Sequence, residues 1–246
     1  MKSVITLVLC VCTWSHAEAT EFNRPWKNDE VALVIDPYAQ NKVDWDKLTS
    51  EKRVIAVIHK ATIGTSRLDK RYLERRSEAK RRGLLWGSYH WGVAGSPVAQ
   101  ADYYIDTVKP ADDELMALDL EDVTSKTLMG ADEALVFVKR IKQRTGRYPV
   151  LYTNHASAKI LSKKFKNSIF QEIPLWYARF KPEVSDFPSG IWKTYTLWQF
   201  SSEILFQHPV AGTARDMDIN VYNGSVPELR AAWPLTRRAN PSNVND

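Results

Sequence analysis

Residues 115–122 read Leu-Met-Ala-Leu-Asp-Leu-Glu-Asp, a short apolar run that ends in acidic side chains. An apolar run of this length indicates a β-strand. Because side chains alternate along a strand, Asp119 and Glu121 are expected to project to one side, and Leu118 and Leu120 to the other. The stretch therefore predicts a strand over Leu115–Leu120 with two neighbouring carboxyl groups at its carboxyl end.

The rest of the chain after Asn28 continues in this way, with apolar runs and amphipathic segments in alternation. The runs Val31–Ile35 and Val54–Ile58 are rich in β-branched residues, which is typical of strands buried on both faces of a parallel sheet. Further strands are expected at Leu84–Trp91, Val150–Tyr152, Leu175–Ala178, Tyr195–Phe200 and Met217–Val221. Helices are expected over Asp69–Arg82, Ala101–Val108 and Ala134–Gly146, and from near Asn154.

This alternation covers about 200 residues and contains neither an internal repeat nor a Gly/Ser linker. It predicts an α/β fold in a single domain, with a parallel and barrel-like sheet.

The two ends of the chain are expected to lie outside this domain. Lys2, a short apolar run and a small-x-small step at Ala17–Ala19 together have the pattern of a secretory signal peptide over residues 1–19. We expect the mature chain to begin at Thr20, with a lead-in over residues 20–30 and the barrel over residues 31–235. Residues 236–246 are polar and aperiodic, and we expect them to be disordered. The protein is therefore predicted to be exported, to the periplasm or the medium.

Composition restricts the class of partner. Both cysteines, Cys10 and Cys12, lie in the expected signal peptide, so the mature chain would lack disulfides, a thiol nucleophile and thiolate metal ligands. The formal net charge is +5, and outside the cytoplasm a basic surface favours cell-wall polymer or lipid headgroups over nucleic acid. No apolar run approaches the roughly 18 residues that span a bilayer, so no membrane insertion is expected. Nine Trp beside ten Tyr are more aromatic residues than a core requires, and such an excess often indicates stacking on sugars or bases, although many of these side chains are expected in the core.

Polar side chains stand where the expected strands end. Because sites in barrels and open α/β sheets are built at the carboxyl ends of the strands, these side chains are expected to converge on one mouth. They are Asp36, His59 and Lys60, Tyr89 and His90, Asp119 and Glu121, Tyr152 and Asn154, Trp176 and Tyr177, Gln199, and finally Asp216 and Asp218 at the start of the last strand.

The pair Asp119 and Glu121 has the clearest chemistry. Two close carboxyl groups raise one another's proton affinity, so one can stay protonated near neutral pH as a general acid. Glycosidases need such an acid for the leaving oxygen and a second carboxylate beside the positive sugar carbon. An Asp-x-Glu pair also occurs in metal sites and surface turns, so it does not decide the function alone. No transition-metal motif, glycine-rich phosphate loop or Gly-x-Ser-x-Gly elbow is present, and no metal or cofactor is predicted.

The motifs taken together resemble those of glycoside hydrolase family 25, the lysozymes of the Chalaropsis and bacterial muramidase type. The resemblance covers roughly residues 31–224, and nine motifs occur in the family's order. They are Ile35-Asp36, Val43-Asp44-Trp45, His59-Lys60-Ala61-Thr62, Gly87-Ser88-Tyr89-His90-Trp91, Ala117-Leu118-Asp119-Leu120-Glu121, Pro149-Val150-Leu151-Tyr152-Thr153, Pro174-Leu175-Trp176-Tyr177-Ala178, Leu197-Trp198-Gln199-Phe200 and Asp218-Ile219-Asn220.

This resemblance implies a distorted TIM-like β/α barrel, acting as a monomer on peptidoglycan glycan strands. It implies hydrolysis of the β-1,4 bond between N-acetylmuramic acid and N-acetylglucosamine. The family's active-site acids fall on Asp36, Asp119, Glu121 and Asp218, with Glu121 as the general acid. Asp119 would orient or stabilise the N-acetyl group or the oxocarbenium-like centre, and the other two acids would tune the pair. The expected substrate-binding residues are Tyr89, Tyr152, Trp176, Lys60 and Gln199, with the barrel core as the alternative location of the three aromatic side chains.

Three departures from the family pattern lie at the expected mouth. Ile63 stands where the family usually carries Glu, Pro37-Tyr38-Ala39 follows Asp36, and His59 occupies a position that is usually apolar. They bear on groove shape and substrate subtype, because no proposed acid is lost. Two other functions remain open at this point. One is a catalytically weak glycan-binding protein on the same barrel, and the other is a different glycosidase such as a chitinase.

Overall fold

The computed structural model describes residues 22–202 and 208–236. The expected signal peptide and residues 237–246 lie outside the described residues. Thr236, the first residue of the expected tail, is described and is buried. The expected lead-in is described from Phe22 onward, and it packs on the barrel, since the ring of Trp26 stacks on that of Phe200 at a centroid distance of 3.8 Å.

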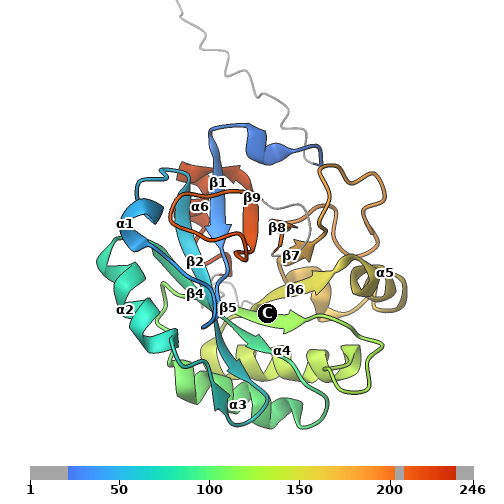
Figure 1. The fold of residues 1–246 in the computed structure, drawn as a ribbon. Coiled ribbons are helices and arrows are strands. Elements are labelled where there is room, and N and C mark those ends of the chain that lie inside the picture. The colour runs from blue at the N-terminus through green and yellow to red at the C-terminus, as the bar shows by residue number, and fades with distance from the viewer. Residues whose placement is uncertain (1–21, 203–207, 237–246) are drawn as a thin grey trace, which may run out of the picture.

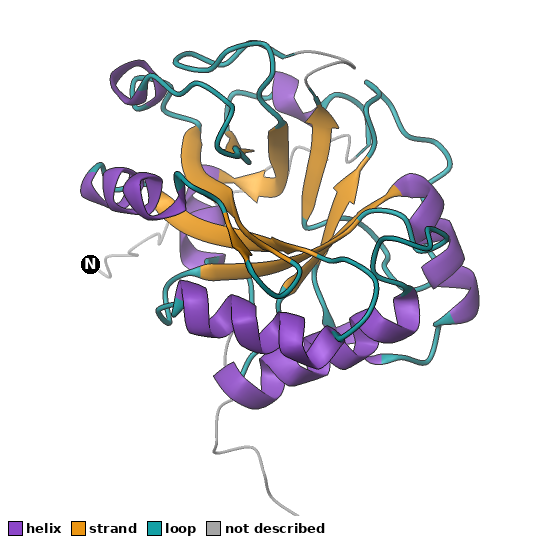
Figure 2. Cartoon of the chain, turned by 60° about the horizontal axis from the view of Figure 1, so that its bottom comes forward, coloured by secondary structure: helices purple, strands orange, loops and turns teal. Residues whose placement is uncertain are grey.

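Eight strands close into a barrel, and helices pack around the outside (Figures 1 and 2). The order around the barrel is β1-β9-β8-β7-β6-β5-β4-β2, and β2 pairs back to β1. The strands are β1 (Val31–Ile35), β2 (Val54–Ile63), β4 (Leu85–Trp91), β5 (Leu115–Leu120), β6 (Val150–Asn154), β7 (Leu175–Ala178), β8 (Leu197–Ser201) and β9 (Ile219–Ser225), with a two-residue β3 (Arg67–Leu68) on β2. The expectation of a single-domain, distorted TIM-like barrel is confirmed.

Four helices lie where helical periodicity predicts them: α2 (Tyr72–Arg81), α3 (Pro97–Val108), α4 (Ala131–Thr145) and α5 (His155–Lys164). The short elements α1 (Trp45–Leu48), α6 (Val226–Ala232), η1 (Pro25–Lys27) and η2 (Ile169–Glu172) were not predicted. Segments of three to seven residues span at most two turns, so they carry too little periodicity to be recognised. None of the helices among the described residues is long and apolar enough to cross a membrane.

The prediction of an all-parallel sheet is wrong for β9. This strand runs antiparallel to both of its neighbours, β1 and β8. Consequently the start of β9, not its end, lies at the mouth formed by the carboxyl ends of the other strands. Asp218 directly precedes β9 and reaches the mouth for this reason, and the backbone N–H of Asp36 donates to its carbonyl oxygen at 3.3 Å. Asp218 therefore reaches the mouth from the start of its strand, whereas Asp36, Asp119 and Glu121 lie at the carboxyl ends of theirs.

Strand alternation divides the apolar residues into two layers. Outward-facing residues such as Leu118 and Leu120 pack against the helices, in the cluster that contains Phe137 of α4. Inward-facing residues such as Ala117 fill the barrel and share a cluster with Leu229 of α6. Because β9 ends on the side of the barrel opposite the mouth, α6 covers that side, and the barrel interior opens at the mouth.

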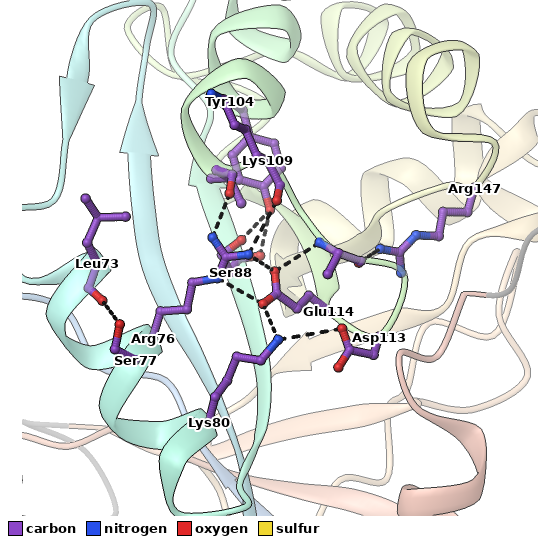
Figure 3. Close-up of polar contacts among 12 residues, drawn as sticks. Leu73, Arg76, Ser77, Lys80, Ser88, Tyr104, Lys109, Asp113, Glu114 and Arg147 are labelled. Carbon is purple, nitrogen blue, oxygen red and sulfur yellow. Dashed lines mark hydrogen bonds and ion pairs between the residues drawn. The ribbon is translucent and has the colours of Figure 1, made fainter.

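A buried ion cluster fixes the start of β5, the strand that leads to the acid pair (Figure 3). Glu114 is 2% exposed, and its carboxylate accepts from the Arg76 guanidinium at 2.6 and 2.9 Å and from the Lys80 ammonium at 2.8 Å. Both cations lie on α2. Burial raises the pKa of Glu114, but the hydrogen bonds from Lys80 and Arg76 outweigh it and leave this pKa below its ordinary value. The cluster therefore ties α2 to the start of β5 through the Glu114 carboxylate, whose charge is balanced by the two cations.

Candidate active site

One cavity at the mouth is lined by eight side chains, and all eight are sequence-predicted site residues. The cavity has a volume of about 50 Å³, and every barrel strand except β2 contributes a lining side chain from the strand or from the residue next to its end. The lining residues are Asp36, Tyr89, Asp119, Glu121, Tyr152, Trp176, Gln199 and Asp218. Lys60 and Asp216 are not among them.

Alternation along β5 explains how the acid pair reaches this cavity. Ala117 faces the barrel interior, whereas Leu118 and Leu120 face the helices. Asp119 therefore points inward two residues after Ala117, and Glu121 follows one step farther toward the mouth. Asp119 is 6% exposed, and its Oδ1 is buried and accepts no hydrogen bond from the described residues.

Both carboxyl groups of the pair bind protons more tightly than usual. Burial and the charge of Glu121 hold the pKa of Asp119 well above its ordinary value, and Lys60 opposes the rise. Burial also raises the pKa of Glu121, again opposed by Lys60, with a smaller contribution from Asp122. A pair of this kind can hold one proton in the pH range where isolated carboxyl groups are ionised.

Asp36 is held by two amide side chains. The Gln199 amide donates to both carboxylate oxygens at 3.1 Å, and the Asn220 amide donates to Oδ2 at 2.5 Å. Burial and the nearby charge of Asp218 raise the pKa of Asp36 well above its ordinary value, and the two amide hydrogen bonds oppose this. The carboxyl group is therefore fixed in position on the side of the cavity formed by β1, β8 and β9.

Three aromatic side chains form the remaining wall. The Trp176 ring lies 4.9 Å from Tyr152 and 6.2 Å from Tyr89 between centroids, both edge to face. The Tyr152 hydroxyl donates to the Gln199 side-chain oxygen at 2.8 Å. Burial and the surrounding carboxyl groups raise the pKa of both tyrosines well above the ordinary value, so both phenols are neutral. The three rings line the cavity, and they also belong to or pack on the apolar cluster inside the barrel. The two locations expected for these side chains, the substrate site and the barrel core, therefore coincide.

Lys60 stands beside this cavity and does not line it. Its ammonium lies 4.4 Å from the centroid of the Trp91 ring and 4.8 Å from that of Tyr38, within cation–π distance of both. Burial lowers the pKa of Lys60, and the charges of Asp119, Asp69 and Glu121 oppose this. In this position the charge of Lys60 lowers the pKa values of Asp119 and Glu121.

His59 and His90 point out of the barrel and pack against aromatic side chains of its outer layer, so the expectation that they converge on the mouth is wrong for these two side chains. His59 Nδ1 lies 2.6 Å from the Lys60 carbonyl oxygen, and its Nε2 lies 3.1 Å from Arg75, which can only donate. His90 lies between Thr62 and Gln100, at 2.8 and 3.1 Å. Burial lowers the pKa of each imidazole to about 4, so both rings are neutral and structural.

Three residues support the site from outside the cavity lining, and of these only Asn154 was expected at the mouth. Asn220 contacts Asp36, and Asn154 donates from its side chain to the Glu121 carbonyl oxygen at 2.5 Å. Ser157 donates to the same oxygen at 2.9 Å. Alternation from Asp218 places Asn220 on the inward face of β9, and this signal could have found it. No group of three or more His, Cys, Asp or Glu side chains within residues 22–202 and 208–236 is arranged to hold a metal ion.

The family profile of glycosyl hydrolases family 25 matches residues 35–208, a span that contains seven of the eight cavity residues. The chain belongs to glycosyl hydrolase family 25.

One similar protein and two similar solved structures agree with this family. Lysozyme M1 of Streptomyces globisporus is 29% identical over 205 residues, which are 78% of this chain and 67% of that protein. The crystal structure of the Streptomyces coelicolor lysozyme is 28% identical, has a TM-score of 0.69, and is matched over 81% of this chain and 95% of that one. The muramidase of Trichobolus zukalii is 27% identical, with a TM-score of 0.66 and a match over 81% and 97% of the two chains. The family 25 chain is thus a glycoside hydrolase of the lysozyme type, and the predictions of family and enzyme class are confirmed.

Proposed function

We propose that this protein is an exported muramidase, which hydrolyses the β-1,4 bond between N-acetylmuramic acid and N-acetylglucosamine in peptidoglycan. The observation that carries the proposal is the acid pair in the cavity. Asp119 and Glu121 are neighbours on one face of β5, both have raised pKa values, and both line a cavity walled by aromatic rings. Muramidases among its relatives support the choice of substrate.

Glu121 is the general acid of the proposed reaction. It is less buried than Asp119, and the raised pKa of its carboxyl group keeps it protonated at a higher pH than an isolated glutamate. In that form it can give its proton to the departing glycosidic oxygen, which is the step that makes the sugar a good leaving group.

The other three acids stabilise positive charge. As the glycosidic bond breaks, positive charge develops on the sugar carbon, and fixed negative groups in a site with little water lower the energy of that state. Asp119 is the neighbour of Glu121 and acts on this centre or on the N-acetyl group. Asp36 and Asp218 lie on the opposite side of the cavity and adjust the field of the pair. The Tyr89, Tyr152 and Trp176 rings contact the sugar, together with Gln199.

Digestion of purified peptidoglycan tests this proposal. The protein without residues 1–19 is incubated with peptidoglycan, and the new reducing ends are identified by mass spectrometry after borohydride reduction. Reduced N-acetylmuramic acid is the expected product. Reduced N-acetylglucosamine would indicate a different specificity, and cleavage of chitin oligomers alone would indicate a chitinase. Binding to peptidoglycan without new reducing ends would indicate a glycan-binding protein.

A further inference from the structure

The side chain of Asn220 is completely buried beside the cavity and makes three hydrogen bonds. Its Oδ1 accepts from the indole N–H of Trp176 at 2.5 Å. Its Nδ2 donates to the Val34 carbonyl oxygen at 3.0 Å and to Asp36 Oδ2 at 2.5 Å. Both donor hydrogens of the amide are therefore used, and one of them reaches a carboxylate in the cavity.

The orientation of this amide follows from the chemistry of its partners. An indole N–H can only donate, so it faces the amide oxygen, and a backbone carbonyl can only accept, so it faces the amide nitrogen. The remaining N–H is then directed at Asp36. Val34 and Asn220 are paired residues of β1 and β9, so the backbone ladder itself sets this geometry.

We propose that Asn220 is a positioning residue for the hydrolysis, whose amide holds the Asp36 carboxylate and the Trp176 ring in a fixed relation. The inference rests on the proposed function. Asp36 is one of the charges beside the reacting sugar, and Trp176 is one of the rings that contacts it. Asn220 does not line the cavity, so it acts through these two groups. A displacement of about 1 Å at groups in a reaction site lowers rates by about 10²-fold.

Asparagine fits this place better than similar side chains do. Leucine has the size but no polar atoms, and it would leave the Trp176 N–H and an Asp36 oxygen without this partner. An ionised aspartate has no hydrogen to donate, and it would place a second negative charge against Asp36. A protonated aspartate does keep one O–H donor and one carbonyl acceptor, so Asn220→Asp is a variant whose fit depends on pH.

The titratable groups around Asp36, the charged partner of Asn220, are all acids or phenols. Charges close to Asp36 come from Asp218 and Asp119, and the phenols of Tyr89 and Tyr152 lie beside them, whereas Lys60 acts on the Asp119 and Glu121 pair. A further carboxyl group here would share a proton with Asp36 at low pH and repel it at high pH.

The test compares kcat, KM and their pH dependence on a soluble tetrasaccharide of alternating N-acetylglucosamine and N-acetylmuramic acid. Asn220→Ala should lower kcat by about 10²-fold with a smaller change in KM. For Asn220→Asp, the ratio of variant to wild-type kcat should fall steadily as the pH rises from 4 to 8. Asn223→Ala is the matched control on the same strand. It removes hydrogen bonds to Thr194 and the Tyr195 carbonyl, and it should retain the wild-type kcat and pH profile.

A ratio for Asn220→Asp that is constant or rises with pH would overturn the positioning role, because loss of folded protein alone lowers activity without this pH dependence. Wild-type kcat in Asn220→Ala would overturn it as well. These results are distinct from failure of the proposed function, in which the wild-type protein itself does not cleave the tetrasaccharide and both inferences are lost.

Discussion

The surroundings of Asp119 disfavour its charged form, so its ionised carboxylate lowers the stability of the fold. It is 6% exposed, one of its oxygens accepts no hydrogen bond from the described residues, and its charge lies close to other carboxyl groups. A carboxylate held only to stabilise the fold would be expected to have a cation or several donors around it. The surroundings of Asp119 fit a group retained for its charge.

We expect Glu121→Gln to lower kcat on peptidoglycan by about 10²–10⁴-fold, because glutamine keeps the size of the side chain but cannot donate a proton to the leaving oxygen. Turnover and thermal unfolding should be measured on the same preparation, together with binding of a glycan fragment. The melting temperature and the binding should be close to those of the wild-type protein. Wild-type turnover in this variant would eliminate Glu121 as the general acid.

We expect Asp119→Asn to reduce turnover by about 10²-fold or more and to raise the melting temperature at pH 7. The pKa of Asp119 in the folded protein is raised, so its stabilising contribution is complete below the unfolded pKa of about 3.9 and is lost as the pH rises through the folded pKa. At pH 7 the charge therefore destabilises the fold relative to a neutral amide. The stability difference, measured by thermal unfolding, should shrink toward pH 4. A lower melting temperature with a proportionate loss of activity would mean that Asp119 merely holds the mouth together.

At the scale of elements, the junction of β6 and α5 connects helix capping with the acid pair. Asn154 ends β6 and is the N-cap of α5, where its Oδ1 accepts from the Ser157 backbone N–H at 2.9 Å. The same amide donates from Nδ2 to the Glu121 carbonyl oxygen. The Asn154 side chain thus caps a helix and also holds the backbone of Glu121, the proposed general acid.

We expect Asn154→Ala to lower the free energy of unfolding by about 1 kcal/mol through loss of the cap, and also to lower kcat by about 10-fold through displacement of Glu121. Ser225→Ala is the matched control, because Ser225 is the N-cap of α6 on the opposite side of the barrel. It should lose similar stability in denaturant titrations with kcat unchanged. Equal kcat in the two variants would show that capping alone is involved.

The ion cluster at the start of β5 makes a separate prediction about pH. The folded pKa of Glu114 is lowered, so its stabilising contribution is present above the unfolded pKa of about 4.3 and is lost as the pH falls through the folded pKa. Glu114→Gln should therefore lower the free energy of unfolding by about 2 kcal/mol at pH 7, and this loss should vanish in acid. The loss is smaller than for a fully buried ion pair because Lys80 is 40% exposed. Denaturant titrations at pH 7 and pH 3 measure this difference in the free energy of unfolding between the variant and the wild-type protein. Glu74→Gln, in the exposed pair with Arg71, should leave stability nearly unchanged at both pH values.

At the scale of the whole molecule, strand positions and inward-facing site residues could be predicted because both depend on local periodicity. Asp119, Tyr152 and Trp176 are examples, since each lies on a strand whose alternation decides its face. The direction of β9 could not be predicted, because a strand's own residues do not specify which way its neighbours run. The role of Asn220 was hidden for a related reason, as its partner Val34 is 186 positions away in the chain.

Export is a prediction about the whole chain. Residues 1–19 should be removed during secretion, so that the mature protein starts at or near Thr20. N-terminal sequencing of protein collected from the periplasm or the medium tests this, and material that starts at Met1 would contradict it. Intracellular protein from the same cells is the control for the unprocessed length.

The antiparallel β9 also has a kinetic consequence. Asp36 and Asn220 are 184 positions apart, and their pairing closes the ring of strands between the first strand and the last. Contacts of such sequence separation form slowly, because the entropy of closing a long loop has to be overcome first. A nascent chain that has not yet reached Asp218 already contains Glu121, the proposed proton donor, but lacks the Asp218 charge and the Asn220 amide on the other side of the cavity. We therefore expect activity only in a chain that has closed the ring of strands, and we expect products of incomplete translation to be inactive.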